Sequence, residues 1–234
     1  MVYLFCAYRD WSFRLFEKLS KRYKSMILLK SPKKLTYRYI KKINPEYIFF
    51  PDWSWMIPKE IVENYRCVCF HESNLPKFRG GSPLQNQILR GITKTKTTAF
   101  FMKDGLDNGD IILQKNLSLK DSINDIFDRM ILNDYDMIVK IIQGKYKQKK
   151  QIGEPTTYKR RNPKQSELDN LEPSKKYIYN FIRMLEDPYP NAFIKIGSKK
   201  IVFKSVKFNN KVLEFNGEII WKFLIIYLYF WFVV

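Results

Sequence analysis

The sequence predicts an α/β protein whose main domain is built on a mostly parallel sheet. Through the first hundred residues, short apolar runs alternate with segments of helical periodicity, which is typical of βαβ units. The apolar runs are almost continuous, as expected for strands that have helices on both faces. With 234 residues, 45% of them hydrophobic, the chain can form one large domain, or one domain of about 150 residues with a smaller appendage.

Four strands and three helices are expected before residue 71. The first helix begins beside Asp10, a residue suited to capping, and carries Phe13, Phe16 and Leu19 on one face. The expected strands are residues 2–8, 26–29, 47–50 and 67–70, and the other expected helices are residues 33–42 and 58–64.

A polar loop, HESNLPKFRGGSP, follows the fourth strand. It is too rich in glycine and proline for a helix or strand, and it lies past the carboxyl end of a predicted parallel strand, where ligands bind in open α/β sheets. Ser82 and Pro83 fit the N-cap and first residue of the next helix, and Gly91 fits its end. Further elements are strands at 96–102 and 110–119 and a helix at 122–143 capped by Asp121.

The second part of the chain is expected to contain a linker and a small β-rich region. Between Lys145 and Lys164 there are eight lysines and arginines and one acid, Glu154, which indicates an exposed, basic segment. The expected division is a main α/β domain at 1–144, a basic linker at 145–172 and a C-terminal subdomain, complete or truncated, at 173–234. This subdomain would hold a helix at 173–185 and strands at 193–197, 200–208 and 212–217.

The last twelve residues, Phe223–Val234, are all uncharged and apolar or aromatic. This run is shorter than the roughly 20 residues that span a bilayer. A buried last strand and an interfacial anchor with weak membrane association are equally supported, and a non-native tail stays open. The same apolar surface could form a homodimer contact.

The net charge of the chain indicates the kind of partner it binds, and its cysteines indicate the cellular compartment. The net charge of +19 points to anionic partners such as phosphates, nucleic acid or a membrane surface. Cys6, Cys67 and Cys69 lie in or beside apolar runs, and the N-terminus lacks the features of a secretory signal, so we expect a cytoplasmic protein without disulfides. A lone CxC pair is a poor metal site, and we expect no metal.

His71, the only histidine in the chain, opens the polar loop, and Asp107 lies in a second turn one helix and one strand later. A carboxylate can hold a histidine in one tautomer for proton transfer, although a lone histidine is more often structural. The chain has no GxGxxG, GxxxxGK[ST] or GxSxG motif, which disfavours the common nucleotide-binding sites and serine hydrolases.

The run from His71 to Gln114, with its HxSxLP loop, RGG, SP and LDNGD, resembles the signature of the 10-formyltetrahydrofolate-dependent formyltransferases. A second block, KRRNPKQSELDNLEPSKKYIYNFIRMLEDPYPNAF, is similar to the segment that leads into the small C-terminal domain of these enzymes. The resemblance implies a Rossmann-like formyltransferase domain and transfer of a formyl group from 10-formyltetrahydrofolate, as co-substrate, to a primary amine.

By this resemblance His71 and Asp107 are the catalytic histidine and aspartate. His71 would polarise the formyl carbonyl and shuttle protons, and Asp107 would hold the imidazole and help to deprotonate the amine. The family's catalytic asparagine is replaced by Cys69, whose thiol is a weak donor. Either Cys69 donates weakly, a neighbour such as Asn74 or a backbone N–H replaces the amide, or catalysis is lost.

The resemblance also assigns binding roles around the loop, each with a structural alternative. Ser73, Leu75 and Pro76 match the part of the loop that lines the folate site, or they simply form a turn. Arg79 and Gly80 could bring an arginine or bare backbone to an anionic ligand. The remaining candidates are Asn74, Gln85 and Asn86 for the substrate, and Asp52, Trp53 and Trp55 beside the pterin.

Two amine acceptors are open under this resemblance. The short segment after residue 173 and the HESNLP wording favour a nucleotide-linked amino sugar, as used in polysaccharide biosynthesis, which is our main expectation. The basic linker favours the alternative, initiator methionyl-tRNA, because such a segment can neutralise phosphates. A further alternative is a catalytically impaired protein that binds folate or nucleic acid.

Overall fold

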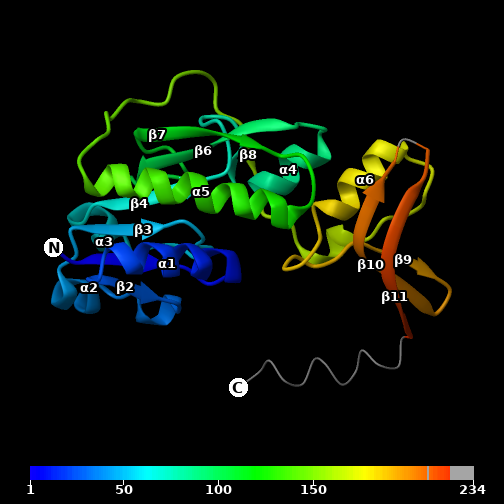
Figure 1. The fold of residues 1–234 in the computed structure, drawn as a ribbon, viewed down its shortest axis with the longest axis horizontal. Helices are drawn as coiled ribbons and strands as arrows, with labels where there is room; N and C mark the ends of the chain where they lie inside the picture. The colour runs from blue at the N-terminus through cyan, green and yellow to red at the C-terminus, as the bar shows by residue number, and fades with distance from the viewer. Residues whose placement is uncertain (210, 222–234) are drawn as a thin grey trace.

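The computed structural model describes residues 1–209 and 211–221. Its centre is a six-stranded sheet with the order β2-β1-β3-β4-β6-β7 (Figure 1). The strands of the first half, β1 (Tyr3–Cys6), β2 (Met26–Leu29), β3 (Tyr47–Phe50) and β4 (Cys67–His71), all pair in parallel. The predicted α/β class with a mostly parallel sheet is therefore confirmed.

The far edge of this sheet is antiparallel. The strand β6 (Lys94–Phe101) pairs antiparallel with β4, and β7 (Ile111–Ser118) pairs antiparallel with β6. The register sets His71 opposite Thr98, so β6 fixes the end of β4 from which the polar loop leaves.

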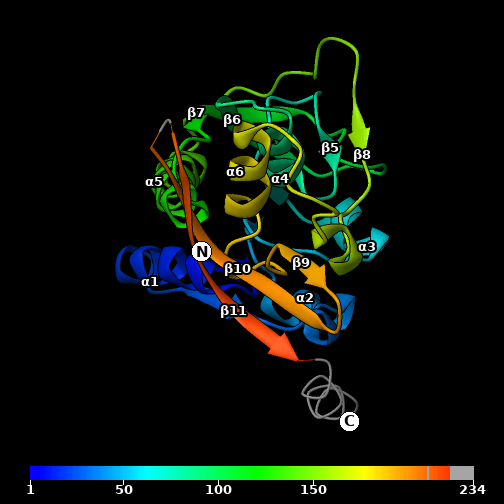
Figure 2. The same cartoon turned by 90° about the vertical axis from the view of Figure 1, so that its right-hand side faces the viewer.

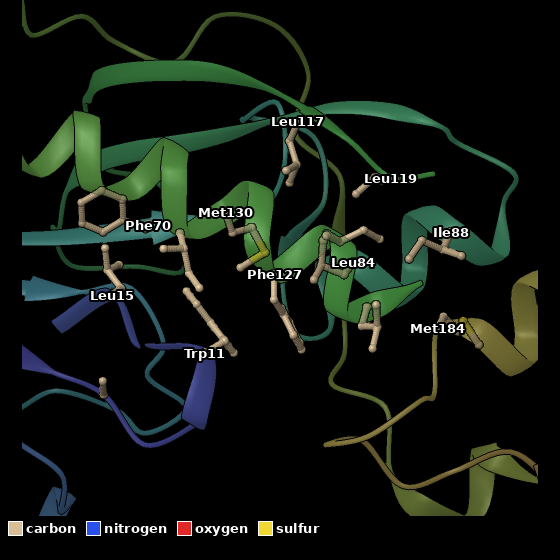
Figure 3. Packing of buried hydrophobic residues seen from close by; sticks show 14 of the residues in the cluster. Trp11, Leu15, Phe70, Leu84, Ile88, Leu117, Leu119, Phe127, Met130 and Met184 are labelled. Carbon is tan, nitrogen blue, oxygen red and sulfur yellow. The ribbon is translucent and has the colours of Figure 1, made fainter. Parts of the chain in front are cut away.

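Helices cover both faces of the sheet, as the apolar strands predict. On one face, α1 (Asp10–Arg22) packs against α5 (Ile123–Ile142), and Trp11 stacks on Phe127 with ring centroids 5.6 Å apart (Figure 3). On the other face, α2 (Tyr37–Ile43) and α3 (Lys59–Asn64) bury Ile40 and Ile61 against Ile48.

Two helix starts differ from the prediction by one residue. Arg9 precedes the first residue of α1, so Asp10 lies inside the first turn, where its negative charge suits the helix dipole. Ser122, rather than Asp121, caps α5, because its hydroxyl accepts the N–H of Asp125 and the Asp125 side chain accepts the N–H of Ser122. The predicted helix at 33–42 is divided into η1 (Pro32–Lys34) and α2.

The polar loop and the linker meet in a small second sheet. Within the loop, β5 (Arg79–Gly80) pairs in parallel with β8 (Thr157–Tyr158), which belongs to the predicted linker. Figures 1 and 2 show the chain leaving α5, arching over the β6–β7 edge and returning to place β8 beside β5. The helix α4 (Pro83–Leu89) then begins at the end of the loop.

The C-terminal part consists of η2 (Pro163–Ser166), α6 (Lys175–Arg183) and a three-stranded antiparallel sheet. The strands β9 (Phe193–Ile196) and β10 (Lys199–Phe208) lie within one residue of the predicted bounds, whereas β11 (Leu213–Trp221) continues four residues past the predicted end at 217. The helix α6 packs on β10. The expectations for residues 223–234, including membrane association, lie outside the described residues, and the boundaries at 144 and 172 stay predictions. No helix in the described ranges is long and apolar enough to cross a bilayer.

Candidate active site

A cleft of about 900 Å³ opens at the carboxyl ends of β3 and β4. One wall comes from the residues after β3 and another from the turn before β7, while β8 closes a third side. Eight of the candidate residues from the sequence line this cleft: Asp52, Trp53, Trp55, Cys69, His71, Gly80, Gln85 and Asp107. The position agrees with the general rule for ligand sites in open α/β sheets.

His71 and Asp107 meet in this cleft. His71 is buried, with 5% of its surface exposed. Its Nε2 lies 2.7 Å from the backbone oxygen of Phe78. Because a carbonyl oxygen can only accept, Nε2 must carry the hydrogen of this bond. The other ring nitrogen, Nδ1, lies 3.7 Å from Oδ2 of Asp107. A proton taken up at Nδ1 would therefore complete an ion pair with Asp107.

Asp107 is held by the polar loop. Its Oδ2 accepts the backbone N–H of Gly80 at 2.7 Å, and its backbone oxygen accepts the side-chain amide of Gln151 at 2.8 Å. Gly80 has a φ of +92°, and a Cβ at this position would lie 2.3 Å from the backbone oxygen of Tyr158. The β5–β8 pairing thus requires glycine at this position, and it fixes the donor that orients the carboxylate.

Cys69 carries a partly buried, protonated thiol in the middle of β4. Burial raises the pKa of the Cys69 thiol well above its usual value, and the Asp107 carboxylate raises it further. Its Sγ lies 3.8 Å from the backbone oxygen of Phe70. At neutral pH this group is a weak hydrogen-bond donor at the edge of the cleft and a poor nucleophile.

The side chains of the Ser-x-Leu-Pro segment stabilise the conformation of the polar loop. The Ser73 hydroxyl donates to the carbonyl of Lys77 at 2.6 Å, and the Thr98 hydroxyl donates to the carbonyl of Ser73 at 2.6 Å. Leu75 is buried against Phe100, while Asn74 is exposed and accepts the side-chain amide of Gln114. Among the described residues, Ser73, Asn74, Leu75 and Pro76 do not line the cleft.

The remaining candidates have different environments. Arg79 donates to the side-chain oxygen of Gln151 at 2.7 Å, so its guanidinium braces the linker. The Asn86 amide donates to the carbonyls of Gly81 and Ser82 and so stabilises the start of α4. Gln85 is buried and lines the cleft.

Several residues that line the cleft were not expected from the sequence. Arg9 forms an ion pair with Asp52 at 2.5 Å, although burial still raises the pKa of the Asp52 carboxyl. Glu72, Tyr189 and Tyr158 line the same cleft. The only sequence signal for β8 is the short β-branched and aromatic run after Pro155, and Glu72 is marked only by its place beside the single histidine.

A sequence model described as "Formyl transferase" matches residues 21–142, which hold both His71 and Asp107. The chain belongs to the formyl transferase family. A second model, described as "Methionyl-tRNA formyltransferase, C-terminal domain", matches residues 163–220. This second match covers η2, α6 and the three-stranded sheet.

Two methionyl-tRNA formyltransferases are similar to most of this chain, and a more distant solved structure shares its fold. The methionyl-tRNA formyltransferase of Syntrophomonas wolfei is 31% identical over 198 residues, which are 79% of this chain and 62% of that protein. The solved methionyl-tRNA formyltransferase from Clostridium thermocellum is 40% identical with a TM-score of 0.90, covering 94% of this chain and 99% of that chain. A sugar N-formyltransferase from a Shewanella species shares the fold, with 18% identity and a TM-score of 0.69. The match covers 90% of this chain and 99% of that chain.

The expectation of a nucleotide-linked amino sugar as acceptor is wrong. It was based on the short segment after residue 173, but that segment forms the helix and sheet that match the C-terminal domain of methionyl-tRNA formyltransferases. The chain spans 62% of the length of the Syntrophomonas relative. In the described residues, no group of three His, Cys, Asp or Glu side chains is placed to hold a metal ion.

Proposed function

We propose that this protein transfers a formyl group from 10-formyltetrahydrofolate to the amino group of methionyl-tRNA. The observation that carries the proposal is the meeting of His71 and Asp107, from two distant segments, in one cleft of a formyl transferase domain. The acceptor is inferred from the match of residues 163–220 to the C-terminal domain of methionyl-tRNA formyltransferases.

The cleft fits a reduced folate in size and in lining. About 900 Å³ accommodates a ligand of this class, and the lining combines Trp53, Trp55 and Leu106 with polar groups at the His71 end. The indole N–H of Trp53 is buried without a partner among the described residues, so it is a donor available to a heterocycle. When bound, the folate supplies the formyl group.

The geometry supports the roles proposed for these residues. The bond from Nε2 to the carbonyl of Phe78 fixes the His71 ring and leaves Nδ1 to exchange protons. Asp107 stabilises the protonated ring, because its Oδ2 is already oriented by the N–H of Gly80 at 2.7 Å. The Cys69 thiol is the weak donor toward the formyl oxygen, which predicts a slow enzyme relative to one with an amide at this position.

The tRNA would lie along the linker. The basic side chains of the linker are exposed, except for Arg161, which is partly buried. Lys159 and Arg160 also line the mouth of the cleft, and Arg160 donates to the hydroxyl of Ser54 at 2.9 Å. Phosphates bound along this linker would lead the aminoacyl end toward His71.

The test is formyl transfer to methionyl-tRNA with His71→Asn as the inactive control. Wild type is expected to release tetrahydrofolate and formylate the tRNA, while the variant is at least about 100-fold slower. Affinity for tRNA should fall steeply between 50 and 200 mM salt, since phosphate contacts release counterions. Folate binding without turnover on any amine would contradict the proposal and favour the impaired binding protein.

A further inference from the structure

Glu72 is a carboxyl group in the cleft that has no ion-pair partner in the described part of the chain. It directly follows His71, is partly buried and lines the cleft. Its backbone is fixed, because the Gln87 amide donates to the Glu72 carbonyl at 2.6 Å and Gln87 is itself held by the Thr95 hydroxyl. The backbone of Glu72 is therefore held in place beside His71.

The charged neighbours of Glu72 are already engaged or neutral. Arg9, the cation on the segment before α1, is paired with Asp52 from the segment after β3. Asp134 approaches from α5, and burial raises the pKa of its carboxyl. Tyr189 approaches from the segment after α6, and burial raises the pKa of its hydroxyl to about 12.

Burial raises the pKa of Glu72 to about 7, and the Asp52 carboxylate adds to this shift, whereas His71 and Arg9 oppose it. A carboxyl in this range is about half ionised at neutral pH and can both take up and release a proton. The amino group of an aminoacyl ester must lose a proton before it can attack a carbonyl carbon. Asp107 is bound to Gly80 and faces His71, so it is already committed.

We propose that Glu72 is the base that binds the protonated amine of the acceptor and takes its first proton. This inference rests on the proposed function. The ammonium gives one proton to the Glu72 carboxylate, and the nitrogen lone pair forms a bond to the formyl carbon while the bond from that carbon to the folate nitrogen breaks. His71 carries the second amine proton to the folate nitrogen, and Glu72 releases its proton to water. The net reaction produces the formamide, tetrahydrofolate and one proton.

The test compares Glu72→Gln and Glu72→Asp with the control Glu60→Gln. Glu60 is exposed on α3 and does not line the cleft. With the same methionyl-tRNA for all proteins, Glu72→Gln should lower kcat about 100-fold with KM changed far less, and Glu72→Asp should retain part of the activity. The thermal midpoints of the variants, measured in parallel, identify any that do not fold.

The pH profile separates a base from a structural group. Between pH 7 and pH 6 the ionised fraction of a group with a pKa near 7 falls about fivefold. The kcat/KM of wild type divided by that of Glu72→Gln should therefore fall about fivefold over this range, while the kcat/KM of wild type divided by that of Glu60→Gln should stay constant. An active wild type with an unaffected Glu72→Gln variant would refute the role of Glu72 and leave the proposed function standing. A wild type that formylates no methionyl-tRNA would refute the proposed function, and the inference with it.

Discussion

Replacing Asp134 by asparagine should stabilise the protein increasingly as the pH rises. Asp134 lies on the inner side of α5 with 0% exposure, and neither carboxyl oxygen has a hydrogen-bond partner among the described residues. Burial raises its pKa well above the usual value, and the carboxyl of Glu72 raises it further. The folded protein therefore keeps a proton on Asp134 that the unfolded chain gives up.

The sign follows from this difference in proton binding. The contribution of Asp134 to stability is fully present below its unfolded pKa of about 3.9 and is lost as the pH rises toward the folded pKa. Each unit between the two values corresponds to about 1.4 kcal/mol of unfolding free energy. Asparagine cannot ionise, so Asp134→Asn carries the same small packing cost at every pH, and its advantage over wild type should grow by at least about 1 kcal/mol between pH 4.5 and 7.5. For a chain of this size, that is a shift of about 2–4 °C in Tm.

Urea unfolding at the two pH values measures this change, with Asp136→Asn as the control on the same helix. The pKa of Asp136 is lowered by Lys140 and Lys115, so its stabilising contribution is present at both pH values, and the cost of Asp136→Asn should be nearly the same at pH 4.5 and pH 7.5. If the difference between Asp134→Asn and wild type is equal at both pH values, the carboxyl of Asp134 is not a neutral buried acid.

Three further predictions concern residues of the cleft. Gly80→Ala should lower both kcat and Tm, because the new Cβ would meet the backbone oxygen of Tyr158. The control Gly91→Ala is also at positive φ but has open space around it, so it should cost only the backbone strain. Equal losses in the two variants would argue against the clash. Cys69→Asn should raise kcat at least about tenfold by supplying an amide donor, and a lower kcat would show that the thiol is the better fit. Native Cys69 should resist iodoacetamide at pH 7.5 when followed by mass spectrometry, because burial raises its pKa; labelling as fast as in the denatured protein would contradict this.

The elements that the sequence predicted well are those set by local pattern. Residues 26–29 and 47–50 are strands with the predicted bounds because each is a continuous apolar run between polar turns. The helix caps were displaced by one residue, since Asp121 and Ser122 are both good caps and only the reciprocal bond with Asp125 selects Ser122. Local chemistry of this kind is visible in the sequence, but the choice between adjacent caps is not.

The contacts that shape the cleft could not be predicted in this way. The pairing of β5 with β8 joins residues almost eighty positions apart through two-residue strands, which have no periodicity to detect. The resemblance to formyltransferases identified His71 and Asp107 as candidates, but not that Gly80 orients Asp107 or that Glu72 lies in the same cleft.

The linker is therefore a structural part of the cleft as well as a charged surface. Tyr158 holds Gly81 through a backbone bond of 2.8 Å, and Gly80 in turn orients Asp107. The next two residues, Lys159 and Arg160, are exposed at the mouth of the cleft. Phosphates bound to these two side chains would restrain β8, and restraint of β8 holds Gly80 and its hydrogen bond in place. On the proposed function, acceptor binding and the orientation of Asp107 thus depend on one short segment, so neutralising Lys159 and Arg160 should raise KM for tRNA and lower kcat together.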